Sequence, residues 1–419
     1  MCPGAESGVE SFAVHVRARP LSKKELDAGN SKSILDVDEE KKTVALEGGR
    51  GNGKTSNDRP SAAFTFDSVF GPLATQNDVY EEIGIPLVAN TVCGFNVCSF
   101  ALGQTSSGKS HTMVGTKADP GLIPRVCSGL FHSFDMLCSA DGMIGPRKVT
   151  SVVVECEYFE IYNEQVRDLL DVSQGVLKVR EHKKLGVFVD KLSKVMVASA
   201  EQAVQVLDRG LLNRTVHATQ MNSVSSRAHA IFQLRLTQKH EVEGKEMALS
   251  SKLMLIDLAG SERAGQQGLK DKRMTEGNNI NKSLSQLMLC IQYLVKQGKQ
   301  RAKQETAGAK ASRPLAIPFR DSKLTWILKE GLSGNARTSL MAAVSPARAN
   351  YEDTLSTLRY AASAKNIKTE SRVQENPLEK KVRELSSEVE RLMGELARFT
   401  GVSSDHNDSC TNTASLMTG

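Results

Sequence analysis

This chain of 419 residues lacks several features that would place it in a special structural class. Its eight cysteines include no C-x-x-C pair, and several of them lie in apolar runs. We therefore expect buried, reduced thiols, with neither a disulfide framework nor a zinc site. No apolar run approaches the length of a membrane span. Residues 1–10 lack the basic and then apolar pattern of a secretory signal, so we expect a cytoplasmic protein.

A strong excess of charge of one sign is also missing. The formal net charge is +6 and the isoelectric point is near 8.8, which favours a partner with an acidic surface without specifying it. Nucleic acid has such a surface, but proteins that bind single strands stack the bases on aromatic side chains. The basic segment 299–313 contains no aromatic residue, which argues against this partner.

The most informative stretch is residues 103–110, which has the pattern G-x-x-x-x-G-K-[ST] of a loop that holds the phosphates of a nucleoside triphosphate. The apolar segment 97–102 precedes it, as a buried strand would. Lys109 is expected to reach the β- and γ-phosphates, and Ser110 to be a ligand of Mg²⁺. The expected nucleotide-binding residues of this loop are Gly103, Gln104, Thr105, Ser106, Ser107, Gly108, Lys109 and Ser110.

A second stretch, residues 48–55, has the same pattern. The residues after it, Ser-Asn-Asp-Arg-Pro at 56–60, have the composition of a loop rather than of a helix start. The apolar segment before it, 43–46, is short and continues into Glu47. Because the pattern is weak without a strand before it and a helix after it, we expect a glycine-rich surface loop here.

Two polar loops further along the chain supply the other groups that phosphoryl transfer needs, namely a metal ligand, a γ-phosphate contact and a group that orients water. Asp257 ends an apolar segment and is placed to hold Mg²⁺ through water. Gly260 allows a backbone N–H to approach the γ-phosphate closely. Glu262, or the pair Ser225 and Ser226, is expected to orient the attacking water. Each residue alone would be an ordinary turn residue, but together with the phosphate loop they indicate a site.

Apolar segments that alternate with helical spacing predict an α/β fold, in which helices cover both faces of a sheet. Function is then expected at the carboxyl ends of the strands. Strands are expected at residues 11–20, 64–70, 97–102, 149–161, 230–236 and 252–257. Helices are expected at residues 77–93, 123–137, 164–170, 200–213, 281–295, 321–332 and 354–364, with a polar loop at 297–313.

Seven stretches of the chain, in order, resemble the motifs of the kinesin motor domain. They are residues 103–110 (GQTSSGKS), 160–164, 222–229 (NSVSSRAH), 257–263 (DLAGSER), 278–284, 319–325 and 354–361. The resemblance extends from about residue 11 to residue 368, more than four fifths of the chain. It implies a P-loop NTPase-type fold with a central, mostly parallel or mixed sheet and helices on both faces. It also implies a microtubule-stimulated ATPase that uses ATP/ADP and Mg²⁺.

The resemblance assigns roles to further residues. On the adenine side the contacts would be Arg17, Arg19 and Pro20, with His111 near the base. Ser226 would meet Mg²⁺ and the γ-phosphate, and Arg227 would pair with Glu262 when the site closes, which positions the attacking water. Ala228 stands where the family usually has serine. That hydroxyl is not the principal Mg²⁺ ligand, so activity is expected to survive, although the closure of the switch or its rate could differ.

Microtubules carry an acidic surface, so the resemblance implies a basic binding face whose affinity falls with salt. Each lysine or arginine alone would be an ordinary solvated residue. The set expected to face tubulin is Lys270, Lys272, Arg273, Lys282, Lys299, Arg301, Lys303, Arg320 and Lys323. The protein would then belong to the cytoplasmic microtubule cytoskeleton.

We divide the chain into a flexible N-terminus (1–10), the motor domain (11–365), a neck linker (366–376), a neck helix (377–398) and a disordered segment (399–419). In the family the neck linker docks on the core after ATP binds, and an N-terminal motor implies plus-end-directed movement. Apolar residues at 378–396 follow a heptad pattern over fewer than three heptads, so they would pair two heads only weakly. The alternative is an amphipathic helix that lies on its own motor domain.

Residues 179–182, 324–328 and 345–351 resemble the kinesin-3 class of cargo transporters. The leading hypothesis is therefore an ATP-driven microtubule motor. The alternative is a microtubule-binding module with weak or altered ATPase turnover, which Ala228 leaves open. A nucleic-acid-binding ATPase ranks far below both.

Overall fold

The structure is a computed structural model. It describes residues 8–27, 32–48, 62–139, 143–144, 147–183, 186–220, 225–242, 245–262, 272–307 and 315–373, and a few positions between 385 and 393. The chain divides into two compact units, Met1–Gln374 and Glu375–Gly419. The expected neck helix and disordered segment lie almost entirely outside the described residues.

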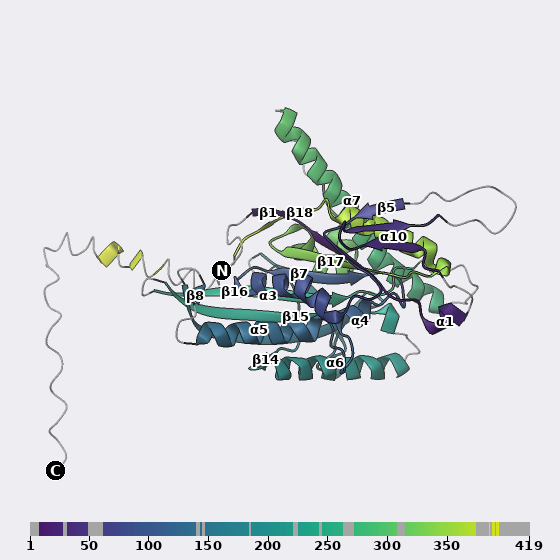
Figure 1. Cartoon of the computed structure of the whole chain (residues 1–419). Coiled ribbons are helices and arrows are strands. Elements are labelled where there is room, and N and C mark those ends of the chain that lie inside the picture. Colours follow the sequence, from purple (N-terminus) through teal and green to yellow (C-terminus); the bar gives the residue numbers. More distant parts are fainter. Residues whose placement is uncertain are drawn as a thin grey trace, which may run out of the picture. The chain divides into compact units, whose positions relative to one another are not determined.

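A sheet of eleven strands forms the centre of the first unit in the described part of the chain (Figure 1). Its strands lie in the order β11 (Val176–Leu177), β10 (Gln165–Asp168), β9 (Arg147–Tyr162), β15 (His229–Val242), β16 (Lys245–Asp257), β7 (Val97–Leu102), β17 (Arg337–Val344), β2 (Ala13–Ala18) and β6 (Ser68–Phe70), while β8 (Met143–Ile144) and β14 (Val195–Val197) pair with β9. Strands from β16 to β6 run parallel, whereas β9, β15 and β16 are antiparallel neighbours. The sheet is therefore mixed, which confirms the predicted fold class.

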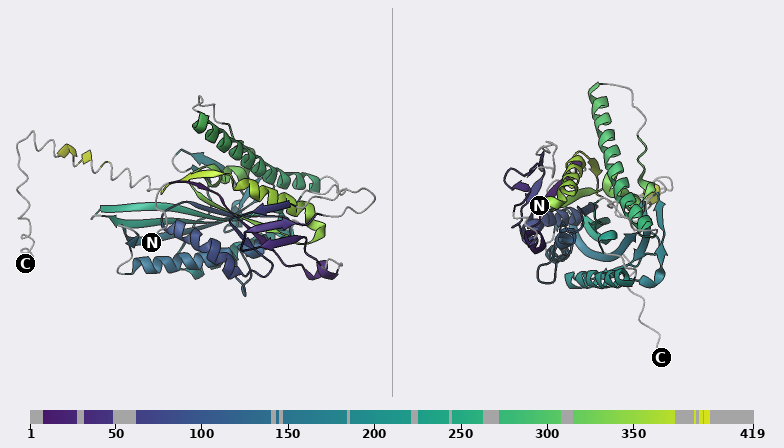
Figure 2. Two further views of the ribbon diagram at one scale, coloured as in Figure 1. Left: turned by 45° about the horizontal axis from the view of Figure 1, so that its top comes forward. Right: turned by 90° about the vertical axis from the view of Figure 1, so that its right-hand side faces the viewer.

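Helices pack on both faces of this sheet (Figures 1 and 2). One face is covered by α2 (Gln76–Val79), η1 (Tyr80–Gly84), α3 (Ile85–Val92), α4 (Lys109–Met113), α5 (Leu122–Cys138) and α6 (Ala200–Gln220). The other is covered by α7 (Lys272–Ala307), α8 (Lys323–Ile327), α9 (Lys329–Ser333) and α10 (Tyr351–Ala364). Two apolar cores result, one on each face, and β7 between them is buried along its whole length.

Shorter elements surround this sheet. They are α1 (Lys23–Asp27), β3 (Leu35–Asp38), β4 (Thr43–Leu46), β5 (Ala62–Thr65), η2 (Val172–Gln174), β12 (Val179–His182), β13 (Gly186–Val189), η3 (Ser225–Arg227), η4 (Phe319–Asp321) and η5 (Arg348–Asn350). Most of the second phosphate-loop pattern, 48–55, lies outside the described residues, between β4 and β5. These two strands are antiparallel neighbours in a small three-stranded sheet.

A separate pair of strands joins the two ends of the first unit. β1 (Gly8–Ser11) pairs antiparallel with β18 (Lys368–Ser371), so the start of the chain lies against the expected neck linker. Residues 8–10 of the segment predicted to be flexible therefore take part in a strand ladder through their backbone groups. The flexibility of residues 1–10 stays a prediction.

Four predicted elements differ from the structure. The strand predicted at 64–70 is two strands, β5 and β6, which belong to different sheets. Residues 164–170 form no helix, because Asn163 and Glu164 take positive φ angles of 52° and 58° and turn β9 back into β10. The polar loop predicted at 297–313 is helical as far as Ala307, since its lysine, arginine, glutamine and alanine residues favour a helix. The helix predicted at 77–93 contains a π-helical turn at Tyr80–Gly84.

The prediction of reduced thiols holds for five cysteines, Cys98, Cys127, Cys138, Cys156 and Cys290. Burial raises the pKa of Cys98 and of Cys156 to about 12, so these thiols are unreactive. The prediction is wrong for Cys93, which is disulfide-bonded. Sequence spacing failed here because a disulfide depends on the distance between two residues in space rather than along the chain. Within the described residues, no helix combines the length and apolar character needed to span a membrane.

Candidate functional site

The phosphate loop joins the end of β7 to α4, in the strand–loop–helix order that the sequence predicts. Gly103 and Gly108 have φ angles of +153° and +102°, which residues with a side chain rarely adopt. A Cβ atom at Gly103 would also lie 2.2 Å from the carbonyl oxygen of Ala343 on the neighbouring strand β17. Both glycines are therefore required by the path of the loop.

Lys109 is buried at the first residue of α4 and lies inside the loop. Its Nζ donates hydrogen bonds to the carbonyl oxygens of Gly103 (2.8 Å) and Gln104 (2.7 Å). Burial lowers the pKa of Lys109, and the charges of Asp257 and Glu262 partly offset this effect. A cation is thus held by neutral carbonyl groups, which an anionic phosphate would replace favourably.

Asp257 ends β16, beside β7, and lies at the same edge of the sheet as the loop. Its Oδ2 accepts a hydrogen bond of 2.6 Å from the hydroxyl of Ser110. Its Oδ1 is buried and has no hydrogen-bond partner within the described residues. An unpaired carboxylate oxygen next to a hydroxyl is the type of donor set that Mg²⁺ prefers, so these residues fit the ion. The described residues contain no cluster of three His, Cys, Asp or Glu side chains that could bind a metal by itself, so further ligands would be hydroxyl, water or phosphate oxygens.

Glu262 reaches the phosphate loop from the loop after β16. Its Oε2 accepts a hydrogen bond of 2.7 Å from the backbone N–H of Thr105, and its Oε1 accepts one from the Thr105 hydroxyl. Gly260 makes this approach possible, because a Cβ atom there would lie 2.3 Å from Glu262 Oε2. A carboxylate therefore occupies N–H and O–H donors of the loop that face the anion site.

The two polar loops also contact each other directly. The backbone N–H of Gly260 donates to the carbonyl oxygen of Ser226 at 2.9 Å, and that of Ser261 donates to Gly103 at 3.0 Å. Arg227 lies half-buried in η3, while the side chain of Ser225 is outside the described set. The phosphate loop, Ser226 and Gly260 are thus brought together, whereas pairing of Arg227 with Glu262 on closure stays a prediction.

His229 is a residue of this site to which the sequence analysis gave no role. Its Nδ1 accepts a hydrogen bond from the N–H of Ala259 (3.0 Å), and its Nε2 lies 2.8 Å from the hydroxyl of Ser283 on α7. The proton therefore sits on Nε2. Burial lowers the pKa of His229 to about 3, so the ring is neutral. His229 connects the loop after β16 to α7, and the sequence signal was only its place in a matched stretch.

Arg214 on α6 is a second such residue. It is buried, its Nη2 donates to the carbonyl oxygen of Ala228 (2.8 Å), and its Nη1 lies 3.7 Å from Asp257 Oδ2. Because the contact to residue 228 uses the backbone, it does not need the serine hydroxyl that the family usually has there. No local pattern marks this arginine, since its partners are far away in sequence.

The residues expected on the adenine side form a connected polar group near the loop. Arg17 Nη1 donates to Gln76 (2.7 Å) and Thr112 (3.1 Å), and the Gln76 amide donates to the carbonyl oxygen of His111 (2.6 Å). Arg19 Nε donates to the carbonyl oxygen of Ser106 at 2.7 Å. Its guanidinium also forms an ion pair with Glu25 and donates to the carbonyl oxygen of Pro20. The sequence analysis missed Gln76, Thr112 and Glu25, because they lie outside the family motifs.

The residues of the expected basic face are placed unevenly. Lys282 and Lys299 are exposed on α7, Arg320 is exposed in η4, and Lys323 is half-buried at the start of α8. Lys272, Arg273, Arg301 and Lys303 belong to α7, but their side chains are not described, and Lys270 lies outside the described residues. Arg301 and Lys303 are therefore helical rather than in the loop that the sequence predicted.

Glu181 on β12 organises part of this face. Its carboxylate binds Arg320 (2.7 Å) and Lys329 (2.5 Å), and it lies 3.4 Å from the indole N–H of Trp326. Arg320 and Lys323 also lie over the Trp326 ring, 5.5 and 5.3 Å from its centroid. The hydrogen bonds from Arg320 and Lys329 lower the pKa of Glu181 to about 2, so it stays charged at any physiological pH.

The kinesin motor domain model matches residues 17–367. The chain belongs to the kinesin motor domain family. Among curated relatives, it is 42% identical to the kinesin-like protein unc-104 of Caenorhabditis elegans over 397 residues. This aligned region covers 92% of this chain and 24% of that protein. It is 41% identical over 413 residues to human KIF13B, covering 95% of this chain and 21% of that protein.

These relatives are kinesin-3 class members, so the predicted class is confirmed, and the chain spans about a quarter of their length or less. Two solved structures are similar throughout. The structure of a fast kinesin is 36% identical, with a TM-score of 0.73, covering 88% of this chain and 94% of that one. A KIF14 dimer, solved with AMP-PNP on a microtubule, is 36% identical with a TM-score of 0.76, covering 90% and 99%.

Proposed function

We propose that this kinesin motor domain hydrolyses ATP to ADP and phosphate, that microtubules stimulate the reaction, and that neck-linker docking couples it to plus-end-directed movement. The observation that carries the proposal is the direct contact of Glu262 with Thr105 in the phosphate loop, 157 positions apart in the chain. This contact links Thr105 of the proposed phosphate-binding loop to Glu262, the residue that would orient the attacking water. Family membership and the KIF14 complex with a microtubule support the choice of track.

In this mechanism Lys109 exchanges its two carbonyl contacts for the β- and γ-phosphates of ATP. Ser110, Ser226 and, through water, Asp257 would hold Mg²⁺, which neutralises charge that develops on the transferred group. Arg214 keeps Asp257 in place and His229 keeps the next loop against α7. These buried contacts fix the reacting groups before substrate arrives, which is how positioning contributes to rate.

Glu262 changes partner during the cycle. A phosphate at the loop competes with its carboxylate for the Thr105 N–H, so binding of ATP would release Glu262. The freed carboxylate would then pair with Arg227 and orient the attacking water. This exchange gives the site two arrangements, one for the empty loop and one for the loaded loop.

The change at the nucleotide site would be transmitted to residues 366–376, the proposed neck linker. This segment contains β18, which is paired with β1. The track would be contacted by the basic face on α7, η4 and α8, and the protein would act on microtubules of the cytoskeleton. A weak homodimer through residues 378–396 stays a prediction, because that segment is almost wholly outside the described residues.

Steady-state ATP hydrolysis with increasing microtubule concentration tests the proposal, with Glu262→Gln as the matched variant. The wild-type rate should rise to a plateau. Glu262→Gln should bind nucleotide but hydrolyse it roughly a hundredfold more slowly or worse, since an amide orients water poorly. A wild-type rate that saturating microtubules leave unchanged would refute the motor and favour a microtubule-binding module with weak turnover.

A further inference from the structure

Arg337 lies at the first residue of β17, at the end of the strand away from the phosphate loop. Four of the contacts that its guanidinium makes lie on different parts of the first unit. Two belong to the core. The Nη1 atom donates to the side chain of Asn90 on α3, and the guanidinium carbon lies 3.8 Å from the centroid of the Phe95 ring. These contacts hold the arginine in place whatever lies above it.

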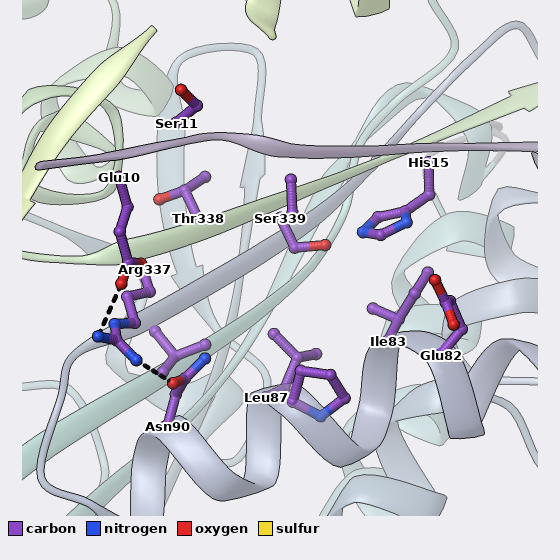
Figure 3. Close-up of a pocket in the computed structure, with 13 residues that line it drawn as sticks. Glu10, Ser11, His15, Glu82, Ile83, Leu87, Asn90, Arg337, Thr338 and Ser339 are labelled. Atoms are coloured by element: carbon purple, nitrogen blue, oxygen red, sulfur yellow. Dashed lines mark hydrogen bonds and ion pairs between the residues drawn. The ribbon is translucent and has the colours of Figure 1, made fainter. Parts of the chain in front are cut away.

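The other two contacts reach the paired strands β1 and β18. Arg337 Nη2 lies 2.7 Å from Glu10 Oε1 on β1, and Arg337 Nε donates to the hydroxyl of Ser371 on β18 at 3.3 Å. Figure 3 shows Arg337 between Glu10 and Asn90, with both interactions drawn. One core side chain thus touches both strands of the pair at once.

A cavity beneath β1 makes these polar contacts more important. It has a volume of about 160 Å³ and is lined by Glu10, Ser11, His15, Asn90, Arg337 and Ser339, among others. Where a strand lies over a cavity, it lacks the close apolar packing that normally holds a strand on its core. The ion pair from Arg337 to Glu10 therefore supplies a larger share of what holds β1 here.

We propose that Arg337 is a positioning residue that recognises the docked pair of strands through Glu10 and Ser371. The inference rests on the proposed function, because β18 lies in the proposed neck linker. The Arg337 side chain is 10% exposed and that of Glu10 is 42% exposed, so their attraction is screened less than that of a pair in which both side chains face water. When the strands leave, both of these contacts are lost, while those to Asn90 and Phe95 remain. The contacts to the strands are made in the docked state and not in the undocked state, so they shift the equilibrium toward docking.

The matched experiment compares Glu10→Gln with Glu370→Gln. Glu370 lies on β18 opposite Val9, and its carboxylate pairs with exposed Arg372 at 3.4 Å instead of with Arg337. Both variants remove one negative charge from the same pair of strands. Spin labels on non-natural residues at Lys368 on β18 and at Leu73, both exposed, would report the distance between the neck linker and the core and leave the pair of Glu370 and Arg372 intact.

With a non-hydrolysable ATP analogue, Glu10→Gln should lower the ratio of docked to undocked molecules about fivefold, and Glu10→Lys should lower it further. Glu370→Gln should stay within about twofold of the wild type. Added salt should reduce the docked fraction of the wild type more than that of Glu10→Gln. Equal docking in Glu10→Gln and Glu370→Gln would overturn the role of Arg337.

The same data separate this inference from the proposed function. If the wild-type distance does not respond to nucleotide, the proposed coupling of ATP to docking fails. The ratio between Glu10→Gln and Glu370→Gln would still decide whether Arg337 holds the strands. Ser371→Ala should have a smaller effect than Glu10→Gln, because it removes one long hydrogen bond and no charge.

Discussion

Lys109 and Glu262 have opposite charges, and both form hydrogen bonds with the phosphate loop. In the proposed mechanism the phosphates of ATP take over these contacts. Lys109 donates to two carbonyl oxygens of the loop, while Glu262 accepts from Thr105. In that mechanism both residues exchange these contacts when the nucleotide binds. At the residue scale, the site is therefore an exchange of partners rather than a rigid cradle.

The residues of the motif were predictable, and their supporting residues were not. Lys109, Ser110 and Asp257 follow from fixed spacing and from strand ends. Arg214 and His229 act through contacts to residues that are distant in sequence. No local sequence pattern distinguishes an arginine or histidine that makes such a contact from one that does not. Only the fold brings these partners within hydrogen-bond distance.

Two buried histidines predict how stability depends on pH. Burial lowers the pKa of His15 to about 4 and of His229 to about 3, from an ordinary value of 6.5. The unfolded chain binds these protons more readily, so stability is complete above pH 6.5 and is lost as the pH falls. Each histidine should cost about 1.4 kcal/mol per pH unit between pH 6.5 and 4.5. Urea unfolding at several pH values measures this slope.

The variant His15→Asn should flatten that slope by one histidine's share, whereas His132→Asn, at an exposed position on α5, should not. The window above pH 4.5 isolates the histidines. Glu25 and Glu181, whose pKa values are lowered to about 2, lose stability only below their ordinary value of 4.5. An unchanged slope in His15→Asn would show that His15 does not titrate as a buried group.

At the scale of elements, the clearest departures from the sequence pattern occur at turns and helix ends. The residues at the start of β10 are compatible with a helix. The two-residue turn at Asn163 and Glu164 instead folds the chain back, so that β10 pairs with β9. The far end of α7 is polar, yet it continues as a helix to Ala307. Long buried strands such as β9 were predictable because their apolar runs leave no alternative, whereas these ends depend on neighbouring elements.

The group around Glu181 predicts a gain of microtubule affinity. Glu181→Gln removes the charge that binds Arg320 and Lys329, which frees one cation of the proposed track-binding face, Arg320, and a neighbouring lysine on α9. The dissociation constant for microtubules should fall about two- to fivefold at low salt, and the difference should shrink at high salt. Co-sedimentation with microtubules measures both.

Glu47→Gln is the control for total charge, because Glu47 pairs with Lys32 at 2.9 Å and neither residue belongs to α7, α8 or η4. It changes the net charge of the chain by the same amount. If both variants raised the affinity equally, the effect would come from net charge and the basic face would not be organised by Glu181.

At the scale of the whole molecule, the predicted mixed sheet with helices on both faces is confirmed, and the family is shown by the match over residues 17–367. The strand pair β1 and β18 was not predictable, because pairing between the two ends of a unit depends on the complete fold. It places the proposed neck linker on the core and gives Arg337 its partners. The phosphate loop and this strand pair lie at opposite ends of β17 and β7.

The proposed motor converts ATP hydrolysis at the phosphate loop into directed movement, and a gliding assay on polarity-marked microtubules measures that movement. With the protein fixed to a surface and ATP present, microtubules should glide with their minus ends leading. Movement should stop in Glu262→Gln. Gliding with plus ends leading would contradict the direction, and microtubules that bind without moving would contradict the motor itself.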